Sequence, residues 1–454
     1  MKPIIQKLVT LTAMLLSMLT ASAYDFEYNG MYFNIISTAD LTCEITYKDG
    51  NYNTYAGNVT IPSEVEYKGR TLTVTRIQDA FRDCINLTSV TIPNSVPVIS
   101  GFSNCTSLTS VNIPNSATDI FSYAFEGCTS LTAVNIPNSV TIISAYAFSG
   151  CSSLTTVNIP NSVTNIGWSA FAGCSSLTSV NIPNSVTEIG WSAFAGCSSL
   201  TSVNIPNSVT EIDASAFADC SNLTAVNIPN SVIWIGAGAF YNCSQLSQVI
   251  FEKGEKELFL QFRGGYQEMF SEDEILTDIT IGRNIRIQRN NNNVWEGFRD
   301  KLNLEYITNL TFLDDVNIEN FFTYNDYSGT LVNLTIGKNV ANYPYSLEQY
   351  SNLQTITLKD PVPQRCPKFV TKQYTDMIIY VPKGSLSAYQ NAYGWENFWD
   401  IREGEYSGIE DTAVTPAKTE VGRYDLQGRK VGEDYRGMVI VRFSDGSVKK
   451  TIVR

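Results

Sequence analysis

The segments Val163–Ser185 and Val186–Ser208 have the same sequence except at one position, where Asn165 in the first corresponds to Glu188 in the second. Both read Val-Thr-x-Ile-Gly-Trp-Ser-Ala-Phe-Ala-Gly-Cys-Ser-Ser-Leu-Thr-Ser-Val-Asn-Ile-Pro-Asn-Ser. Related 23-residue units fill the chain from Phe81 to Phe240. A cysteine marks the register in each unit, at Cys84, Cys105, Cys128, Cys151, Cys174, Cys197, Cys220 and Cys243. Such an array spreads function over a surface.

The pattern inside one unit explains why the units must stack. Leu177, Val180 and Ile182 point one way from an extended segment, Ile189 lies in a second short strand, and Phe194 follows on a turn. One coil cannot enclose these side chains, so its neighbours complete the core. A period in the twenties with a Leu-x-x-Val-x-Ile strand is typical of a leucine-rich repeat solenoid. We therefore predict a β-rich leucine-rich repeat solenoid with short helical turns.

Composition restricts the function. The formal net charge is −13, with 44 acidic against 31 basic residues, which excludes nucleic acid as a partner. The chain has no histidine, which excludes Ser-His-Asp and Cys-His catalysis and every imidazole zinc site. We expect no enzyme, no cofactor and no metal. A carboxylate-only carbohydrate-active enzyme stays as the alternative, and its candidate acids are Glu252, Glu255, Glu257, Glu268, Glu272, Asp273 and Glu274.

The N-terminus predicts export. Lys2 and Lys7 precede the apolar run Leu8–Leu19, and Ala21-Ser22-Ala23 offers a cleavage site, as in a secretory signal peptide. No other segment reaches the roughly 20 apolar residues of a transmembrane helix. For the repeat cysteines we expect buried thiols, because free cysteine is among the most buried residue types. Disulfides between adjacent coils are the alternative, since the coil spacing lies within bonding range.

The sequence divides into six parts. We predict a signal peptide (1–23), an N-terminal cap (24–76), regular leucine-rich repeats (77–250), irregular repeats with a C-terminal cap (251–404), a polar linker (405–420) and a C-terminal tail (421–454). In the irregular part the strand pattern continues at Leu276–Ile281, Leu331–Ile336 and Leu353–Leu358.

The Ile-Pro-Asn-Ser-Val and Ala-Phe-x-x-Cys motifs, the lead-in Val74–Ile77 and the closing segment Val381–Ser385 resemble the BspA-like leucine-rich repeat family of bacterial surface proteins. The resemblance implies a right-handed solenoid without catalytic activity, and adhesion to host extracellular-matrix proteins or to other bacteria. The tail, with Gly422–Val431 and Gly437–Arg442, resembles C-terminal sorting domains of type IX secretion. It departs from them in being short and in having Met438-Val439 where an aromatic residue is usual.

Two surfaces are candidates for binding. An aromatic group precedes the Ala-Phe pair in four consecutive coils, and we name it the aromatic stripe: Phe121, Tyr123, Tyr146, Trp168 and Trp191. Exposed Trp and Tyr are frequent at interfaces, although packing against the solenoid edge explains them equally well. The other surface is an outward amide row on the first strand of each coil, which includes Asn135, Asn158, Asn181 and Asn204. A solvated sheet is the alternative explanation for this row.

We therefore predict a secreted or cell-surface protein, outside the outer membrane, that adheres to a host or microbial macromolecule through the solenoid. The expected partner is a host extracellular-matrix protein, a bacterial surface protein or a glycan. A passive spacer that displays the irregular segment is a further alternative.

Overall fold

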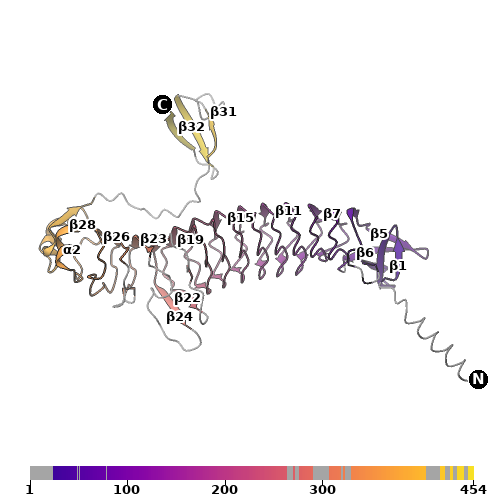
Figure 1. Ribbon diagram of the computed structural model, residues 1–454, viewed down its shortest axis with the longest axis horizontal. Coiled ribbons are helices and arrows are strands. Elements are labelled where there is room, and N and C mark those ends of the chain that lie inside the picture. The colour runs from indigo at the N-terminus through magenta and orange to yellow at the C-terminus, as the bar shows by residue number, and fades with distance from the viewer. Residues whose placement is uncertain are drawn as a thin grey trace, which may run out of the picture. The chain divides into compact units, whose positions relative to one another are not determined.

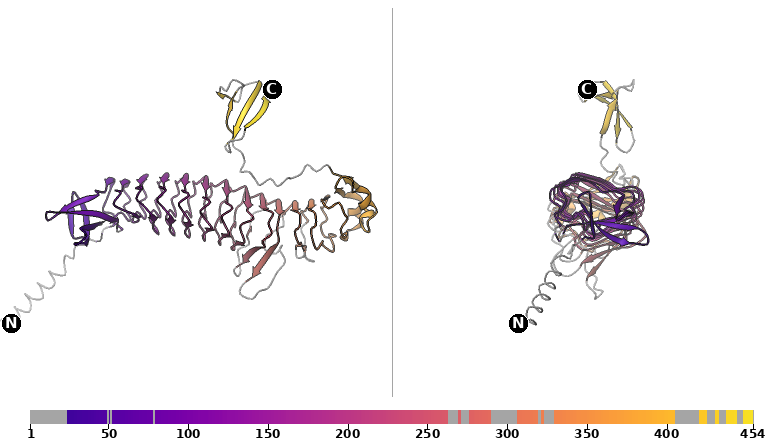
Figure 2. Two further views of the ribbon diagram at one scale, coloured as in Figure 1. Left: turned by 180° about the vertical axis from the view of Figure 1, so that it is seen from behind. Right: turned by 90° about the vertical axis from the view of Figure 1, so that its right-hand side faces the viewer.

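The computed structural model describes residues 24–48, 50, 52–77, 79–262, 269–270, 276–289, 306–318, 321–322, 329–404, 420–424, 430–432, 437–443 and 448–453. The chain divides into a large unit, Met1–Glu405, and a small unit, Tyr406–Arg454. The large unit is a solenoid of stacked coils (Figure 1). Seen along its axis, the coils superimpose (Figure 2).

Each regular coil contributes one strand to each of two parallel stacks. The first stack pairs equivalent residues of successive coils, such as Val157 with Val180 and Val180 with Val203. Its strands are β4 (Gly57–Thr60), β7 (Leu87–Thr91) and β9 (Ser110–Asn112) in one sheet, and β11 (Ala133–Asn135), β13 (Thr156–Asn158), β15 (Ser179–Asn181) and β17 (Ser202–Asn204) in the next. A third sheet continues with β19 (Ala225–Ile228), β21 (Gln248–Phe251), β23 (Asp278–Ile281), β25 (Asn309–Phe312), β26 (Asn333–Ile336), β27 (Thr355–Leu358), β28 (Ile378–Val381) and β29 (Asp400–Glu403).

The second stack is one nine-stranded sheet. Its strands are β8 (Val98–Ile99), β10 (Asp119–Ile120), β12 (Ile142–Ile143), β14 (Asn165–Ile166), β16 (Glu188–Ile189), β18 (Glu211–Ile212), β20 (Trp234–Ile235), β22 (Leu258–Phe262) and β24 (Ile285–Arg289). The second residue of each short strand is a buried isoleucine, and the first faces outward. The predicted leucine-rich repeat solenoid is thus confirmed. Its repeat turns are hydrogen-bonded turns rather than helices, and the described helices lie in the C-terminal cap.

The core is an axial column of phenylalanine rings. Phe148, Phe171 and Phe194 are fully buried, and their ring centroids lie 5.3 and 5.4 Å apart with nearly parallel planes. The column runs from Phe81 to Phe240 and reaches Phe270, because one coil spacing suits parallel rings. At its N-terminal end the ring of Tyr55 lies 4.9 Å from that of Phe81.

The ten cysteines, all within the described part of the chain, are thiols rather than disulfides. In each regular coil the buried thiol donates a hydrogen bond to the Phe carbonyl of the preceding coil, as Cys197 does to Phe171 at 3.3 Å. Burial raises the pKa of Cys174 to about 12. The repeat cysteines are therefore buried thiols as expected, and those from Cys105 to Cys243 each link two coils.

Caps close both ends of the solenoid. At the N-terminus a five-stranded sheet has the order β1 (Phe26–Tyr28), β2 (Met31–Ser37), β3 (Thr42–Thr46), β6 (Arg70–Ile77) and β5 (Glu64–Tyr67). At the C-terminus lie α2 (Thr371–Asp376), α3 (Leu386–Gln390) and η4 (Trp395–Asn397). Buried Tyr389 and Trp395 hold this cap to the last coils by hydrogen bonds to the carbonyls of Asp360 and Gln364.

The small unit is an antiparallel sheet of order β31-β30-β32-β33. Its strands are β30 (Glu420–Tyr424), β31 (Lys430–Val431), β32 (Gly437–Phe443) and β33 (Val448–Val453). Among the described residues of both units, no helix has the length and apolar character needed to cross a bilayer. The predicted signal peptide and most of the linker lie outside the described residues.

Candidate functional site

The aromatic stripe lies on the turn that follows the second strand of each coil. Phe121, Tyr123, Trp168 and Trp191 are 56, 48, 61 and 43% exposed, and Tyr146 is partly buried. The turn hydrogen bonds hold this geometry: Tyr146 N donates to Trp168 O at 2.8 Å, and Phe171 N donates to Ala193 O at 2.8 Å. The stripe side chains therefore face outward above the buried phenylalanine column.

The two halves of the stripe differ in backbone conformation. Tyr123 and Tyr146 have left-handed φ angles of 61° and 59°. In the next coils Ser169 and Ser192 take that position, with φ of 52°, so the tryptophans stand one residue earlier in their units. The tyrosine rings stack with centroids 5.0 Å apart. The ring contacts of the described residues include no such pair between the two indoles.

Trp168 also packs on the next coil. A Cβ atom at Gly190 would lie 3.3 Å from Cδ1 of Trp168 and 2.9 Å from the carbonyl oxygen of Ile166. The absence of a side chain at Gly190 therefore leaves room for the indole. This contact is of the kind that the sequence left open as the alternative, in which the stripe side chains pack against the edge of the solenoid.

Two acidic side chains occupy outward positions on neighbouring strands of the second stack. Glu188 and Glu211 are direct partners on adjacent parallel strands. Partial burial first, and then Glu211 and Asp213, raise the pKa of Glu188. No Lys or Arg occurs between Ile85 and Cys243, so these coils supply no cation to neutralise the acids.

The amide row is flat and exposed. Asn135, Asn158, Asn181 and Asn204 occupy equivalent positions on β11, β13, β15 and β17, each in register with the next. Within the described residues no hydrogen bond joins these four amides to one another. An amide ladder does form in the irregular coils, where Asn333 Nδ2 donates to Asn309 Oδ1 at 2.7 Å.

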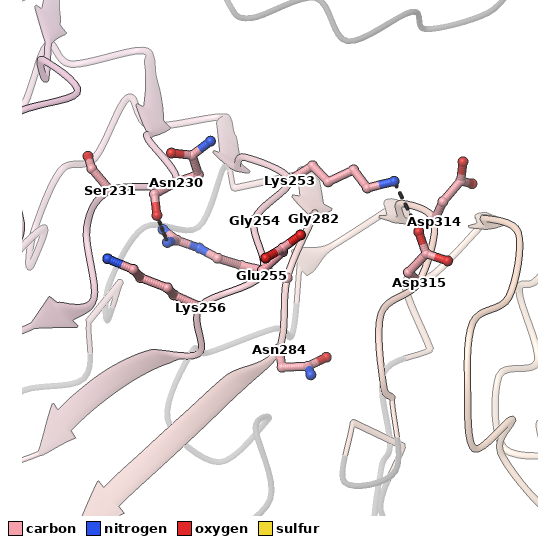
Figure 3. A pocket seen from close by; sticks show the side chains of 11 residues that line it. Asn230, Ser231, Lys253, Gly254, Glu255, Lys256, Gly282, Asn284, Asp314 and Asp315 are labelled. Atoms are coloured by element: carbon pink, nitrogen blue, oxygen red, sulfur yellow. Dashed lines mark hydrogen bonds and ion pairs between the residues drawn. The ribbon is translucent and has the colours of Figure 1, made fainter.

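A polar pocket of about 890 Å³ marks the place where the regular repeats end (Figure 3). Lys253 Nζ lies 3.1 Å from Asp315 Oδ2 across it. Beneath it runs Arg283, which is 1% exposed and donates to the carbonyls of Pro229, Asn230 and Val232 at 2.9, 2.9 and 2.6 Å. Burial lowers the pKa of Arg283 to about 10. In the regular coils a buried valine, such as Val232, ends this turn, and the following coil has Glu255 there instead. The buried side chain of Arg283 completes the core at this point.

Two of the candidate acids in this region, Glu252 and Glu257, have structural partners. Glu252 accepts hydrogen bonds from Asn227 Nδ2 at 2.5 Å and from Asn230 N at 3.2 Å. Glu257 pairs with Arg286 at 2.6 Å. Glu255 lines the pocket, and the other candidate acids, Glu268, Glu272, Asp273 and Glu274, lie outside the described residues. Among the described residues no group of three or more acids or cysteines has the arrangement of a metal site.

Comparisons with known proteins agree with this repeat architecture. The sequence matches the family described as BspA type leucine rich repeat region, in six copies, over residues 74–198 and 166–291. A leucine-rich repeat protein from Bacteroides ovatus is 21% identical, with a TM-score of 0.46 and coverage of 84% of this chain and 100% of its own. A comparison with curated proteins finds no match.

Two further solved structures are similar to parts of this chain. The Treponema pallidum leucine rich repeat protein is 30% identical over 44% of this chain and 90% of its own, with a TM-score of 0.38. A leucine rich cell surface protein from Faecalibacterium prausnitzii is 26% identical over 75% of this chain and 95% of its own, with a TM-score of 0.39. The repeats of residues 74–291 therefore match the BspA type leucine-rich repeat family.

Proposed function

We propose that this chain is a secreted or cell-surface binding protein that adheres to a host or microbial protein through the aromatic stripe. The family consists of leucine-rich repeat proteins, whose solenoids bind proteins, and this supports a binding role over a catalytic one. Beyond a general binding role, we propose the aromatic stripe as the binding site and a protein as the partner.

One observation carries the proposal. The positions of Trp168 and Trp191 hold alanine in the coils on either side, at Ala145 and Ala214. The same turn forms in those coils, so the fold does not require an aromatic side chain there. Packing alone therefore leaves the two exposed indoles unexplained, whereas a large aromatic contact area at an interface explains them.

The geometry favours a protein partner over a glycan at this site. A sugar ring stacks on the open face of an aromatic ring. Tyr123 and Tyr146 stack on each other, and Trp168 contacts the Gly190 coil, so part of their ring surface is already covered. The exposed parts form a line of apolar contacts along the coils. Such a line suits side chains of a protein surface.

The same proposal includes the route to the surface. Residues 1–23 have the pattern of a secretory signal peptide, and the basic, β-rich tail after residue 420 resembles a type IX sorting domain. Together these features support delivery to the exterior of the outer membrane.

The test uses the mature chain on an array of extracellular-matrix proteins, bacterial surface proteins and glycans. The double variant Trp168→Ala/Trp191→Ala should bind the array's protein ligand about 30-fold more weakly or worse, because an aromatic anchor contributes about 2 kcal/mol or more. Trp399→Ala is the matched control, since Trp399 is 81% exposed in the C-terminal cap. Undiminished affinity of the double variant would move the site to the amide row or to the irregular coils.

A further inference from the structure

The C-terminal cap contains a basic segment within the acidic large unit. Arg365, Lys368 and Lys372 occur without any acidic residue between Asp360 and Asp376. The formal charge of the whole chain is −13, so a run with three cations and no acid differs from the sequence around it. Within the described part of the chain, no carboxylate forms an ion pair with Arg365.

Two of these cations surround one exposed tyrosine. The guanidinium carbon of Arg365 lies 4.7 Å from the ring centroid of Tyr345, and Lys368 Nζ lies 4.8 Å from the same centroid. Tyr345 is 57% exposed. The ring thus holds both positive charges near each other at the surface, through cation–π contacts.

The backbone fixes this arrangement. Lys368 N donates to Tyr345 O at 3.0 Å, and Leu347 N donates to Lys368 O at 2.8 Å. On the other side, the buried indole of Trp395 donates to Gln364 O at 2.8 Å. The cations therefore project from a segment that is held at both ends, so binding a ligand there orders little additional backbone.

A pocket lies on each side of this segment. One, of about 530 Å³, is bordered by Phe322, Asn342 and Tyr343, and the other, of about 560 Å³, by Tyr374, Tyr393 and Asn397. Tyr345, Gln364 and Arg365 line both pockets. Each pocket combines aromatic walls with side-chain amides, and Tyr393 is 94% exposed.

Cys366 also borders the second pocket but does not provide an anion or a nucleophile there. Burial, followed by the charge of Glu396, raises the pKa of Cys366 to about 12. The thiol stays protonated at neutral pH and donates to Pro367 O. The lining of this pocket therefore carries the charges of Arg365 and Lys368 and no thiolate, and Glu396 lies close enough to act on the Cys366 thiol.

We propose that the paired pockets around Tyr345 bind an acidic oligosaccharide, with Arg365 and Lys368 on its carboxylate or sulfate groups. The open ring of Tyr393 contacts the apolar face of a sugar ring, and the amides of Gln364 and Asn397 bond hydroxyl groups. Two cations are too few for a membrane surface, which takes clusters of about 4–8 basic residues. This site is separate in sequence from the aromatic stripe, and the proposal does not depend on it.

The experiment measures binding of the mature chain to heparin oligosaccharides, polygalacturonate oligosaccharides, neutral dextran and poly-glutamate by calorimetry. We expect binding to a sulfated or a carboxylated oligosaccharide and none to dextran. Comparing heparin with polygalacturonate distinguishes recognition of sulfate from recognition of carboxylate. Arg365→Gln/Lys368→Gln should weaken this binding about tenfold or more, because charge-assisted hydrogen bonds are lost. Lys338→Gln/Lys383→Gln removes the same charge elsewhere in this half and should leave the affinity within about twofold of the parent.

Three results would overturn the proposal. Absence of binding to both acidic oligosaccharides would reject the site. Equal losses of oligosaccharide affinity in the two double variants would show that binding depends on net charge and not on this site. If poly-glutamate binds as tightly as the acidic oligosaccharides, the ligand is an acidic peptide and not a sugar. Trp168→Ala/Trp191→Ala should leave oligosaccharide binding unchanged, so failure at this site and failure at the aromatic stripe are distinguishable.

Discussion

Arg283 donates a hydrogen bond of 2.6 Å to the carbonyl oxygen of Val232, which belongs to a coil two turns earlier in the solenoid. The intervening coil has Glu255 in place of the buried valine that ends each regular turn. The arginine side chain is buried, and its guanidinium donates to three carbonyls of the coil before the intervening one. The regular and irregular halves are thus joined through one buried cation.

Replacing Arg283 by methionine should destabilise the solenoid. Methionine keeps the apolar stem but leaves the three carbonyls without a charged donor, and a buried unsatisfied group costs about 1–3 kcal/mol. We expect a loss of about 2–4 kcal/mol in urea unfolding followed by circular dichroism. Arg286→Met, at a half-exposed arginine paired with Glu257, should cost less than about 1 kcal/mol. Equal costs for the two variants would contradict the bridging role of Arg283.

The cysteines should be unreactive in the native state. Burial raises the pKa of Cys84 to about 11 and that of Cys174 to about 12, and the thiolate is the reactive form. A thiol reagent at pH 8 should therefore modify few groups in native protein and nearly all ten in denatured protein without reductant. If denatured protein reacts only after reduction, the coils carry disulfides instead.

The indoles of the aromatic stripe should contribute little to stability. Exposed substitutions usually change the free energy of unfolding by no more than about 0.5 kcal/mol, and we expect this for each of Trp168→Ala and Trp191→Ala. Phe171→Ala, which interrupts the buried ring column, should cost about 3–5 kcal/mol. Thermal unfolding of the variants compares them directly. A large loss in the tryptophan variants would show that the indoles are packing residues.

Glu188 should make stability depend on pH. Its pKa in the folded state is raised above the ordinary 4.5, so the folded state binds the proton more tightly and stability falls as pH rises through the raised pKa. Glu188→Gln should therefore stabilise the solenoid by about 0.2–1 kcal/mol at pH 7, where Glu188 faces Glu211, and have no effect below the ordinary pKa. Asp119→Asn is the control, since its strand neighbours are Val98 and Ile142. A benefit of Glu188→Gln that persists at low pH would rule out the charge explanation.

Removal of residues 422–454 should separate folding from delivery. The solenoid forms a compact unit without the tail, so the truncated chain should keep its far-ultraviolet circular dichroism and its melting temperature. Surface exposure should be lost if the tail acts as a sorting domain. Protease accessibility on whole cells measures it, and unchanged exposure would refute the sorting role.

The sequence was sufficient to predict the regular coils because the contacts there repeat with the sequence. Val157, Val180 and Val203 are equivalent in the repeat, and the structure pairs them in the same order. The phenylalanine and cysteine columns follow for the same reason. In these coils each side chain contacts its own unit and the two neighbouring units. The repeat period identifies which residues of those units are equivalent.

The irregular coils could not be predicted in this way, because insertions change the spacing between equivalent residues. Arg283 reaches residues more than two units away, and no local pattern identifies it as buried. Arg365 and Lys368 had a sequence signal, namely cations without neighbouring acids, but their convergence on Tyr345 depends on the pairing of Ser346 with Lys368. Only the three-dimensional register of unequal coils reveals that site.

The units Val163–Ser185 and Val186–Ser208 are so nearly identical that recombination could remove one of them. Excision of one unit by recombination would join Ser185 to Val209 and bring Ile166 beside Ile212, which is the same contact that Ile189 makes with Ile212 now. Every core column would close without a gap, while the outer surface would lose one tryptophan. A chain with one unit fewer would therefore keep the same kinds of core contact between neighbouring coils, and its aromatic stripe would be shorter by one coil.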